Sequence, residues 1–473
     1  MADTTEDEDK ISIKVIVDKV NKRVVCAEVD YSFVDILFSY VTLPMGTIAR
    51  LLGTHDDKKF ECLGSFNNLY HSLKDLPHRY LSTECKSMLL NPRSLSYDYC
   101  RHLELKIDDT EPSHYFECHN RCCSSYDKVL SCNNLSSEHD RSQSCRGCYT
   151  YLPSMRFEES YWYSSDYDLV SLFTNSVGSG VFVSDSGTFI VTDDLCVEPY
   201  NMASSIRLLT DLGITDMNHL EERNLQMSSY QMLYFLKLAL STHRPFTYFV
   251  FSKICPETDV FISWIDSTSQ HNDFIIKEES ASSKIHLELS LQKSTGKLLF
   301  AESKADFVEF LFGFLSLPLG TVIGTLTKGA FTSRCMDNIL RSISHMSVGK
   351  YLKSQDIKDM LLTPHFGQKY ISKNQIFPLN GVPLRSDEIE NNDIKIDGGF
   401  LKQSGMFLVT DDLTITPSSL ASSIDLLKKL EVAPEDIERC EVSISLKEGL
   451  SMLKESLRSS SILTKSLEHQ VKK

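Results

Sequence analysis

The chain of 473 residues carries 49 basic and 64 acidic side chains, which gives a formal net charge of −15. Its apolar fraction of 41 % and charged fraction of 24 % argue against a disordered, collagen-like or membrane-embedded chain. The length predicts two to four domains, and the acidic charge disfavours binding to nucleic acids or anionic membranes.

The N-terminus, MADTTEDEDK, lacks the features of a secretory signal or a transit peptide. We therefore expect residues 1–10 to be a disordered acidic start and the protein to be cytoplasmic, with the nucleus as an open alternative. Two apolar stretches, Phe33–Leu52 and Phe307–Leu326, each contain a carboxylate and a central proline. This pattern predicts buried helices broken at Leu-Pro and no membrane span.

The elements follow from periodicity, in chain order. Alternating residues predict a hairpin from 11–17 and 23–28, followed by a helix from Ser32 to about Leu52. Short strands are expected at 189–191, before an Asp-Asp turn, with a helix after it and another from Tyr230 to Leu240. Mixed strands and helices without regular βαβ alternation predict an α+β fold.

The same elements recur later in the chain. Residues 26–47 and 300–321 are identical at 10 of 22 positions, and residues 186–212 and 404–430 at 16 of 27. The later elements are a hairpin formed by residues 285–291 and 297–302, a short strand at 407–409 and a C-terminal helix at 446–457. Because the blocks keep their order, the sequence predicts a tandem duplication of one unit.

The predicted domain organisation has five parts. They are a disordered start at 1–10, a first repeat unit at 11–250 with a cysteine-rich insertion at about 100–160, a connecting segment at 251–283, a second unit at 284–460 and a loose tail at 461–473.

The insertion of the first unit contains six of the 14 cysteines. Cys118-x3-Cys122 and Cys145-x2-Cys148 form two close pairs, the arrangement by which a chain builds a tetrahedral four-thiolate zinc site. These four cysteines are the predicted ligands of a structural zinc. Several residues are alternatives to them, namely Cys123 in place of Cys122 and the histidines His114, His119 and His139. Unliganded thiols and redox chemistry are the alternatives to zinc.

Catalytic motifs are not found. The sequence contains no phosphate-binding Gly-x4-Gly-Lys-Ser/Thr, no His-Glu-x2-His and no Gly-x-Ser-x-Gly. The best acid/base candidates are Asp193-Asp194 and Asp411-Asp412, although adjacent aspartates after a strand are more typical of a tight turn. Glu28 and Glu302 recur at equivalent positions and are expected to cap or face solvent. We therefore assign no catalytic residue.

The chain resembles a plant family named domain of unknown function 674. The resemblance rests on FVDILFSYVTLPMGTIARLLG, on LKIDDTEPSHYFEC leading into the cysteine pairs, and on the repeated FxVTDDLxxxPxxxASSIxLL. It covers about Ile11 to Leu463 and implies a soluble protein, often with tandem copies, and no known reaction. The second unit lacks the cysteine insertion, so no second metal site is expected.

These observations favour a non-enzymatic interaction or scaffold protein that holds a structural zinc and binds unidentified protein partners. One alternative is an enzyme of unknown reaction with its site between the two repeats. The other is nucleic-acid binding through the insertion, which the net charge opposes. The basic residues of that alternative are Arg121, Lys128, Arg141 and Arg146.

Overall fold

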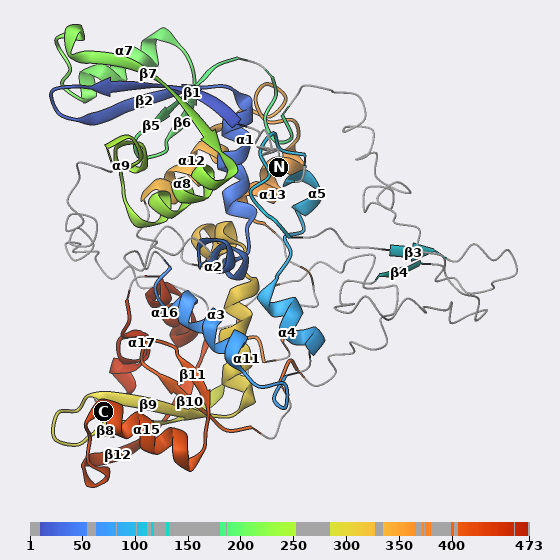
Figure 1. The fold of residues 1–473 in the computed structure, drawn as a ribbon, viewed down its shortest axis with the longest axis vertical. Coiled ribbons are helices and arrows are strands. Elements are labelled where there is room, and N and C mark those ends of the chain that lie inside the picture. Colours follow the sequence, from blue (N-terminus) through green and yellow to red (C-terminus); the bar gives the residue numbers. More distant parts are fainter. Residues whose placement is uncertain are drawn as a thin grey trace, which may run out of the picture.

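The computed structural model describes two halves of the chain, each built around a five-stranded antiparallel sheet (Figure 1). We call residues 10–251 the first half and residues 284–471 the second half. The structure describes residues 10–53, 63–81, 83–100, 102–110, 115–117, 129–131, 180–185, 187–251, 284–326, 334–364, 367, 371–372, 374–377, 379, 399–401, 405–457 and 459–471.

The first sheet has the strand order β6-β5-β2-β1-β7. Its strands are β1 (Lys10–Asp18), β2 (Arg23–Val29), β5 (Phe189–Thr192), β6 (Val197–Pro199) and β7 (Leu220–Ser228). The predicted hairpin is confirmed as β1 and β2, and the Asp18 carboxylate accepts hydrogen bonds from the backbone N–H groups of Val20 and Asn21 in its turn. Alternate residues of β1, such as Ile13 and Val15, are buried on one face, as the period of two requires.

The second sheet has the corresponding order, β11-β10-β9-β8-β12. Its strands are β8 (Ile285–Gln292), β9 (Leu298–Ser303), β10 (Phe407–Thr410), β11 (Ile415–Pro417) and β12 (Ile437–Ile444). The second predicted hairpin and the short strand at 407–409 are therefore confirmed. Together with the helices, these sheets confirm the α+β class.

The two apolar stretches form broken helices in the centre of the molecule. In the first half they are α1 (Tyr31–Ser39), the 3-10 turn η1 (Tyr40–Thr42) and α2 (Met45–Gly53); in the second half they are α11 (Ala305–Gly313), the 3-10 turn η4 (Phe314–Ser316) and the π-helix η5 (Thr321–Leu326). The break falls at the predicted Leu-Pro step, because proline has no N–H to donate inside a helix. Within the described ranges, no helix is both long and apolar enough to cross a membrane.

Two helices cross from their own half to the other. Helix α3 (Ser65–Asp75) belongs to the first half and packs on β11 and α11 of the second. Helix α12 (Arg334–His345) belongs to the second half and packs on β6 and α8 of the first. Neither helix is among the elements that sequence periodicity predicts.

The remaining elements complete the two halves. They are α4 (Thr83–Leu90), α5 (Tyr97–Cys100), α7 (Met202–Asp211), η3 (Met217–His219), α8 (Ser229–Ser241) and α9 (Pro245–Phe251), then α13 (Gln355–Leu362), α15 (Leu420–Leu430), η8 (Pro434–Asp436), α16 (Leu446–Ser456) and α17 (Ile462–Val471), with the separate two-stranded pair β3 (Tyr115–Glu117) and β4 (Val129–Ser131).

The expectation of a loose tail at 461–473 is wrong for most of that segment. Helix α17 spans Ile462–Val471, and its residues Ile462, Leu463 and Leu467 are fully buried in the core. The polar residues of this segment form the exposed side of an amphipathic helix. A helix this short is stable only because its apolar face packs against α16 and β12.

Candidate functional site

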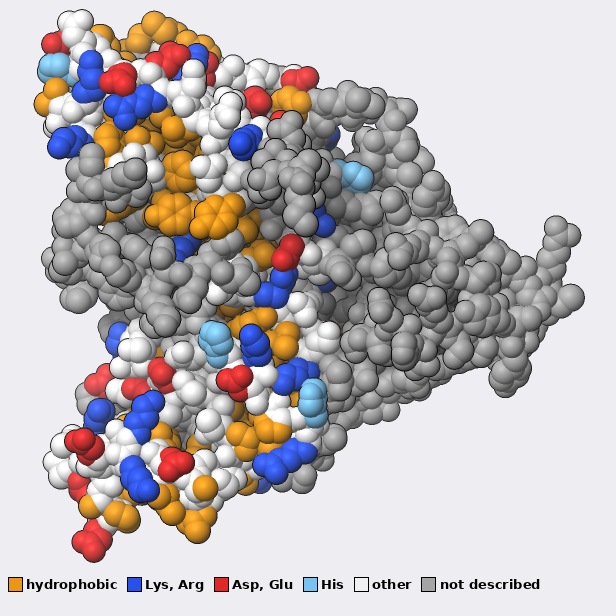
Figure 2. Space-filling view, in the orientation of Figure 1, with side chains coloured by type: hydrophobic (Ala, Val, Ile, Leu, Met, Phe, Trp, Pro, Cys, Tyr) orange, Lys and Arg blue, Asp and Glu red, His pale blue; other side chains and the backbone are white. Residues whose placement is uncertain are grey.

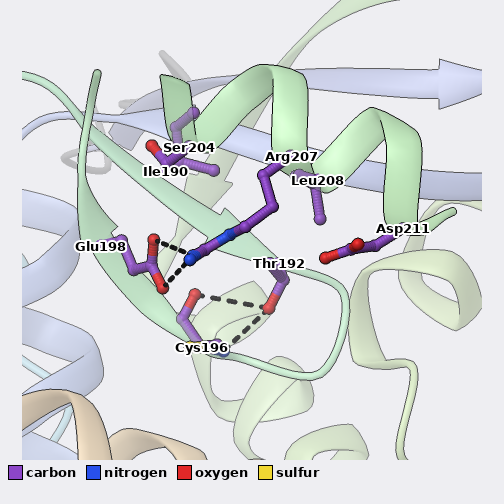
Figure 3. A pocket seen from close by; sticks show the side chains of 8 residues that line it. All are labelled: Ile190, Thr192, Cys196, Glu198, Ser204, Arg207, Leu208 and Asp211. Carbon is purple, nitrogen blue, oxygen red and sulfur yellow. Dashed lines mark hydrogen bonds and ion pairs between the residues drawn. The ribbon is translucent and has the colours of Figure 1, made fainter. Parts of the chain in front are cut away.

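A pocket of about 80 Å³ lies between helix α7 and the β5–β6 hairpin of the first sheet (Figure 3). It is on the sheet face opposite the main core. The lining residues are Ile190, Thr192, Cys196, Glu198, Ser204, Arg207, Leu208 and Asp211. Helix α7 begins at its N-cap Asn201, whose side chain accepts a hydrogen bond from the Ser204 N–H and so fixes the start of the helix shortly after β6.

The polar groups of the pocket bond mainly to one another. The Arg207 guanidinium reaches from α7 to both carboxylate oxygens of Glu198, at 3.4 and 3.3 Å (Figure 3). The Thr192 hydroxyl accepts a 3.0 Å hydrogen bond from the Cys196 N–H. Because Arg207 and Glu198 are well exposed, their ion pair adds little to stability.

The Cys196 thiol is not an activated nucleophile. Burial raises its pKa, with smaller contributions from the charges of Glu198 and Asp194, so that the thiol form is favoured at neutral pH. The pocket is also well below the roughly 300–1,000 Å³ typical of small-molecule sites. The pocket can hold a few water molecules. Its described lining residues do not form an acid/base pair that could transfer a proton to or from a substrate.

The equivalent place in the second half is filled. There, Leu299, Phe300 and Leu408 form a small buried cluster under helix α15. Phe300 faces Thr410 across the sheet, whereas the residue facing Thr192 in the first sheet is Cys26. A thiol is much smaller than a phenyl ring, so the first sheet carries less side-chain volume at this position than the second.

The paired aspartates of the two turns hold structure together, as the turn interpretation predicts. Asp193 accepts hydrogen bonds from the backbone N–H and the hydroxyl of Thr247, at 2.9 and 2.5 Å. Burial raises the pKa of Asp193 to about 6, although both bonds from Thr247 oppose the shift. Asp411 makes the same pair of bonds with Thr464, both at 2.8 Å.

The second aspartate of each pair bonds within its own turn. The Asp194 carboxylate accepts from the Thr192 hydroxyl at 2.6 Å, and Asp412 accepts from Thr410 at 2.5 Å. The two turns belong to β5 and β10, which lie in different sheets at opposite ends of the molecule (Figure 1). The four carboxylates therefore do not converge on one substrate atom.

Glu28 and Glu302 lie on β2 and β9, which are central strands of the two sheets. Glu28 is partly exposed, and its carboxylate is 4.0 Å from the Lys14 ammonium. The expectation that Glu28 faces solvent agrees with this placement, and neither glutamate lines the pocket.

The structure places two buried carboxylates where the sequence indicated only apolar helices. Asp35 of α1 is 2 % exposed and accepts hydrogen bonds from the backbone N–H groups of Val181, Phe182 and Val183. Glu309 of α11, at the equivalent position, is 1 % exposed. A carboxylate within each strongly apolar segment was the available signal, because a buried charge requires a partner.

Glu309 also anchors a distant segment of the chain. Its two carboxylate oxygens accept hydrogen bonds from the Leu401 N–H, the Ser372 hydroxyl and the Asn374 side chain, each at 2.7 Å. In both halves the buried carboxylate thus fixes the segment that leads toward β5 or β10. These groups are structural anchors.

The predicted zinc ligands Cys118, Cys122, Cys145 and Cys148 lie outside the described residues, as do the alternatives Cys123, His114, His119 and His139. Among the residues that the structure does describe, no three His, Cys, Asp or Glu side chains form a group able to hold a metal. Most of the scattered cysteines that it describes are buried, as expected; these are Cys26, Cys85, Cys100 and Cys335, while Cys196 and Cys440 are half-buried.

Comparison with known proteins identifies a family. A family model described as "Protein of unknown function (DUF674)" matches residues 7–447. Neither the curated proteins nor the solved structures contain a match to this chain.

Proposed function

The chain belongs to the DUF674 family, and from that premise we propose that it is a non-enzymatic interaction scaffold with two equivalent docking faces. The observation that carries this proposal is a pair of apolar residues left exposed on each outer helix. Met202 and Ile206 of α7 are 67 % and 54 % exposed, and Leu420 and Ile424 of α15 are 79 % and 43 % exposed.

Each pair lies one helical turn apart, so both side chains project from the same face of the helix. Helices α7 and α15 contain no fully buried residue and lie at opposite ends of the molecule (Figures 1 and 2). A scattered exposed hydrophobic residue needs no explanation, but the same pair at two equivalent positions favours contact with a partner. The partner's chemistry is that of an amphipathic helix, whose apolar stripe matches this spacing.

The test is the stoichiometry of a captured partner. Because two equivalent faces are available, native mass spectrometry is expected to find two partner molecules per chain. Ile206→Glu or Ile424→Glu alone reduces this to one, and the double variant abolishes binding. Val348→Glu, at an exposed valine that belongs to neither outer helix, is the matched control and leaves binding unchanged. A partner retained in full by the double variant would overturn the proposal.

We further propose that Cys118, Cys122, Cys145 and Cys148 bind a structural zinc ion. The cysteine spacing supports this, as does the position of the β3–β4 pair. Strand β3 ends at Glu117, directly before Cys118, so the first cysteine pair follows a strand of a hairpin. Thiolate ligands require a reducing compartment such as the cytoplasm, and a closed four-thiolate site organises structure without catalysing a reaction.

Zinc analysis of the purified full chain is expected to find one ion per molecule. Cys145→Ser and Cys148→Ser each lower the zinc content severalfold, since a three-thiolate site binds far more weakly. Cys440→Ser, at a half-buried cysteine of β12, is the control and keeps its zinc. Comparing Cys122→Ser with Cys123→Ser identifies the fourth ligand. The proposal is contradicted if the wild-type chain contains no zinc. It is also contradicted if the Cys145→Ser and Cys148→Ser variants both keep the zinc content of the wild type.

We also propose that the two halves arose by tandem duplication and that the cysteine-rich segment is an insertion in the first. Support comes from the identical residues of the repeated blocks and from the corresponding strand orders of the two sheets.

A further inference from the structure

The two halves meet through backbone contacts that are reciprocal. The Met45 N–H donates to the Leu317 carbonyl and the Leu319 N–H donates to the Leu43 carbonyl, both at 2.9 Å. These bonds flank a bridge between Pro44 and Pro318, the two prolines of the repeated Leu-Pro steps. Each half therefore donates one backbone N–H to the other half and accepts one hydrogen bond from it, at equivalent positions of the two Leu-Pro steps.

The crossing helices make reciprocal side-chain contacts. The Asn68 amide of α3 donates to the Asp412 carbonyl of the second half at 2.9 Å. The Asn338 amide of α12 donates to the Asp194 carbonyl of the first half at 2.8 Å. Each helix thus holds the Asp-Asp turn of the other half's sheet.

The same helices cover the edge strands β11 and β6. The Ile415 N–H donates to the Ser72 hydroxyl of α3 at 2.9 Å, and the Val197 N–H donates to the Ser342 hydroxyl of α12 at 2.8 Å. An edge strand has backbone groups that need a partner or a cover. In each half that cover is supplied by the other half.

Close approach at the centre is reciprocal as well. A Cβ atom at Gly46 would lie 3.0 Å from the Leu315 carbonyl oxygen, and one at Gly320 would lie 3.0 Å from the Val41 carbonyl oxygen. Two further bridges, Leu81–Leu401 and Val183–Leu352, also join the halves. In an isologous interface the same surface patch of both partners is used, so every contact occurs twice with the roles of the partners exchanged. This is the type of interface that joins identical subunits.

We infer that the central face of each half is a self-complementary docking surface whose partner is a second copy of the same unit, from this chain or from another copy of it. Two chains can then exchange halves, so that the first half of one pairs with the second half of the other. The inference is independent of zinc and of the outer docking faces.

Residues 252–283 decide which pairing forms. A connection of this length keeps the second half at an effective concentration of about millimolar. At lower protein concentrations the two halves of one chain therefore pair with each other. Exchange between chains is expected when the connection becomes too short to reach.

The test deletes residues 254–283 from the full chain. Two residues then join Phe251 to Lys284 and span at most about 10 Å, whereas α9 lies with the first sheet and β8 within the second (Figure 1). Sedimentation is expected to give twice the monomer mass, with an unchanged circular dichroism spectrum. The matched control replaces residues 254–283 by a Gly/Ser segment of equal length and stays monomeric.

A deletion variant that remains a folded monomer would overturn the inference. If the variant does not fold, a second measurement decides. A protease site placed in the connection of the full-length chain is cut, and the two fragments are expected to co-elute at the mass of the intact chain and to separate in urea. Fragments that separate without denaturant would refute a self-sufficient interface.

Discussion

Asp35→Ala is expected to lower the free energy of unfolding by about 3 kcal/mol at pH 5. The substitution leaves the backbone N–H groups of Val181, Phe182 and Val183 without their acceptor in the core, and an unsatisfied buried donor costs about 1–3 kcal/mol. The lost contacts join α1 to the segment before β5. Part of the cost is offset because a buried polar carboxyl group is removed with them.

The effect of Asp35→Ala should decrease as the pH rises. Burial raises the pKa of Asp35 to about 7 in the folded protein, although the three N–H groups and Lys353 oppose the shift. A carboxyl group with a raised folded pKa contributes most stability below its unfolded value of 3.8 and loses that contribution as the pH rises through about 7. The wild type therefore loses stability relative to the variant between about pH 4 and pH 7.

Urea unfolding of both proteins at pH 5 and pH 8 measures this difference. The control is Asp185→Ala, which removes an exposed carboxylate four residues after Val181 and should change stability by less than about 0.5 kcal/mol at either pH. A loss for Asp35→Ala that is equal at both pH values, or larger at pH 8, would contradict the assigned role of Asp35.

Gly399→Ala is expected to cost about 3 kcal/mol or more, or to prevent folding. Gly399 has a φ of +102°, and a Cβ atom there would overlap the Glu309 carboxylate. That carboxylate cannot move aside cheaply, because Ser372, Asn374 and the Leu401 N–H hold it by three hydrogen bonds. The substitution therefore combines backbone strain with the loss of a buried anchor.

Gly187→Ala separates the two contributions. Gly187 also has a positive φ, +118°, but a Cβ atom there would have no neighbour within 4 Å. This variant pays only the backbone strain, about 1 kcal/mol. Thermal and urea unfolding should therefore show a much smaller effect than for Gly399→Ala. Equal losses in the two variants would indicate that the Glu309 contact contributes nothing.

The local elements could be predicted from the sequence because their causes are local. The alternation in β1 and the turn at Asp18 specify a hairpin wherever it packs. Pro44 breaks a helix in any context. The VTDDL turn is similar. The second aspartate of each turn accepts a hydrogen bond from the threonine two residues before it, and Leu195 and Leu413 take the left-handed conformation that closes both turns.

The candidate site could be predicted only in part. The sequence indicates the Asp-Asp turn beside the pocket and favours a structural role for it. Glu198, Cys196 and Arg207 did not stand out, because they come together only when α7 packs over the β5–β6 hairpin. Beside Thr192 the neighbouring strand carries Cys26, whereas the second sheet carries Phe300 at the corresponding position.

The sequence by itself determined the α+β class, the repeated hairpins and the broken central helices, since each follows from short-range pattern. Only the tertiary structure decided where α3, α12 and α17 pack, and that α3 and α12 each pack on the half to which they do not belong. The physical reason is the origin of their stability. Short amphipathic helices gain little stability from local propensity. They form because surfaces distant in the chain bury their apolar faces and accept the hydrogen bonds that Asn68 and Asn338 donate.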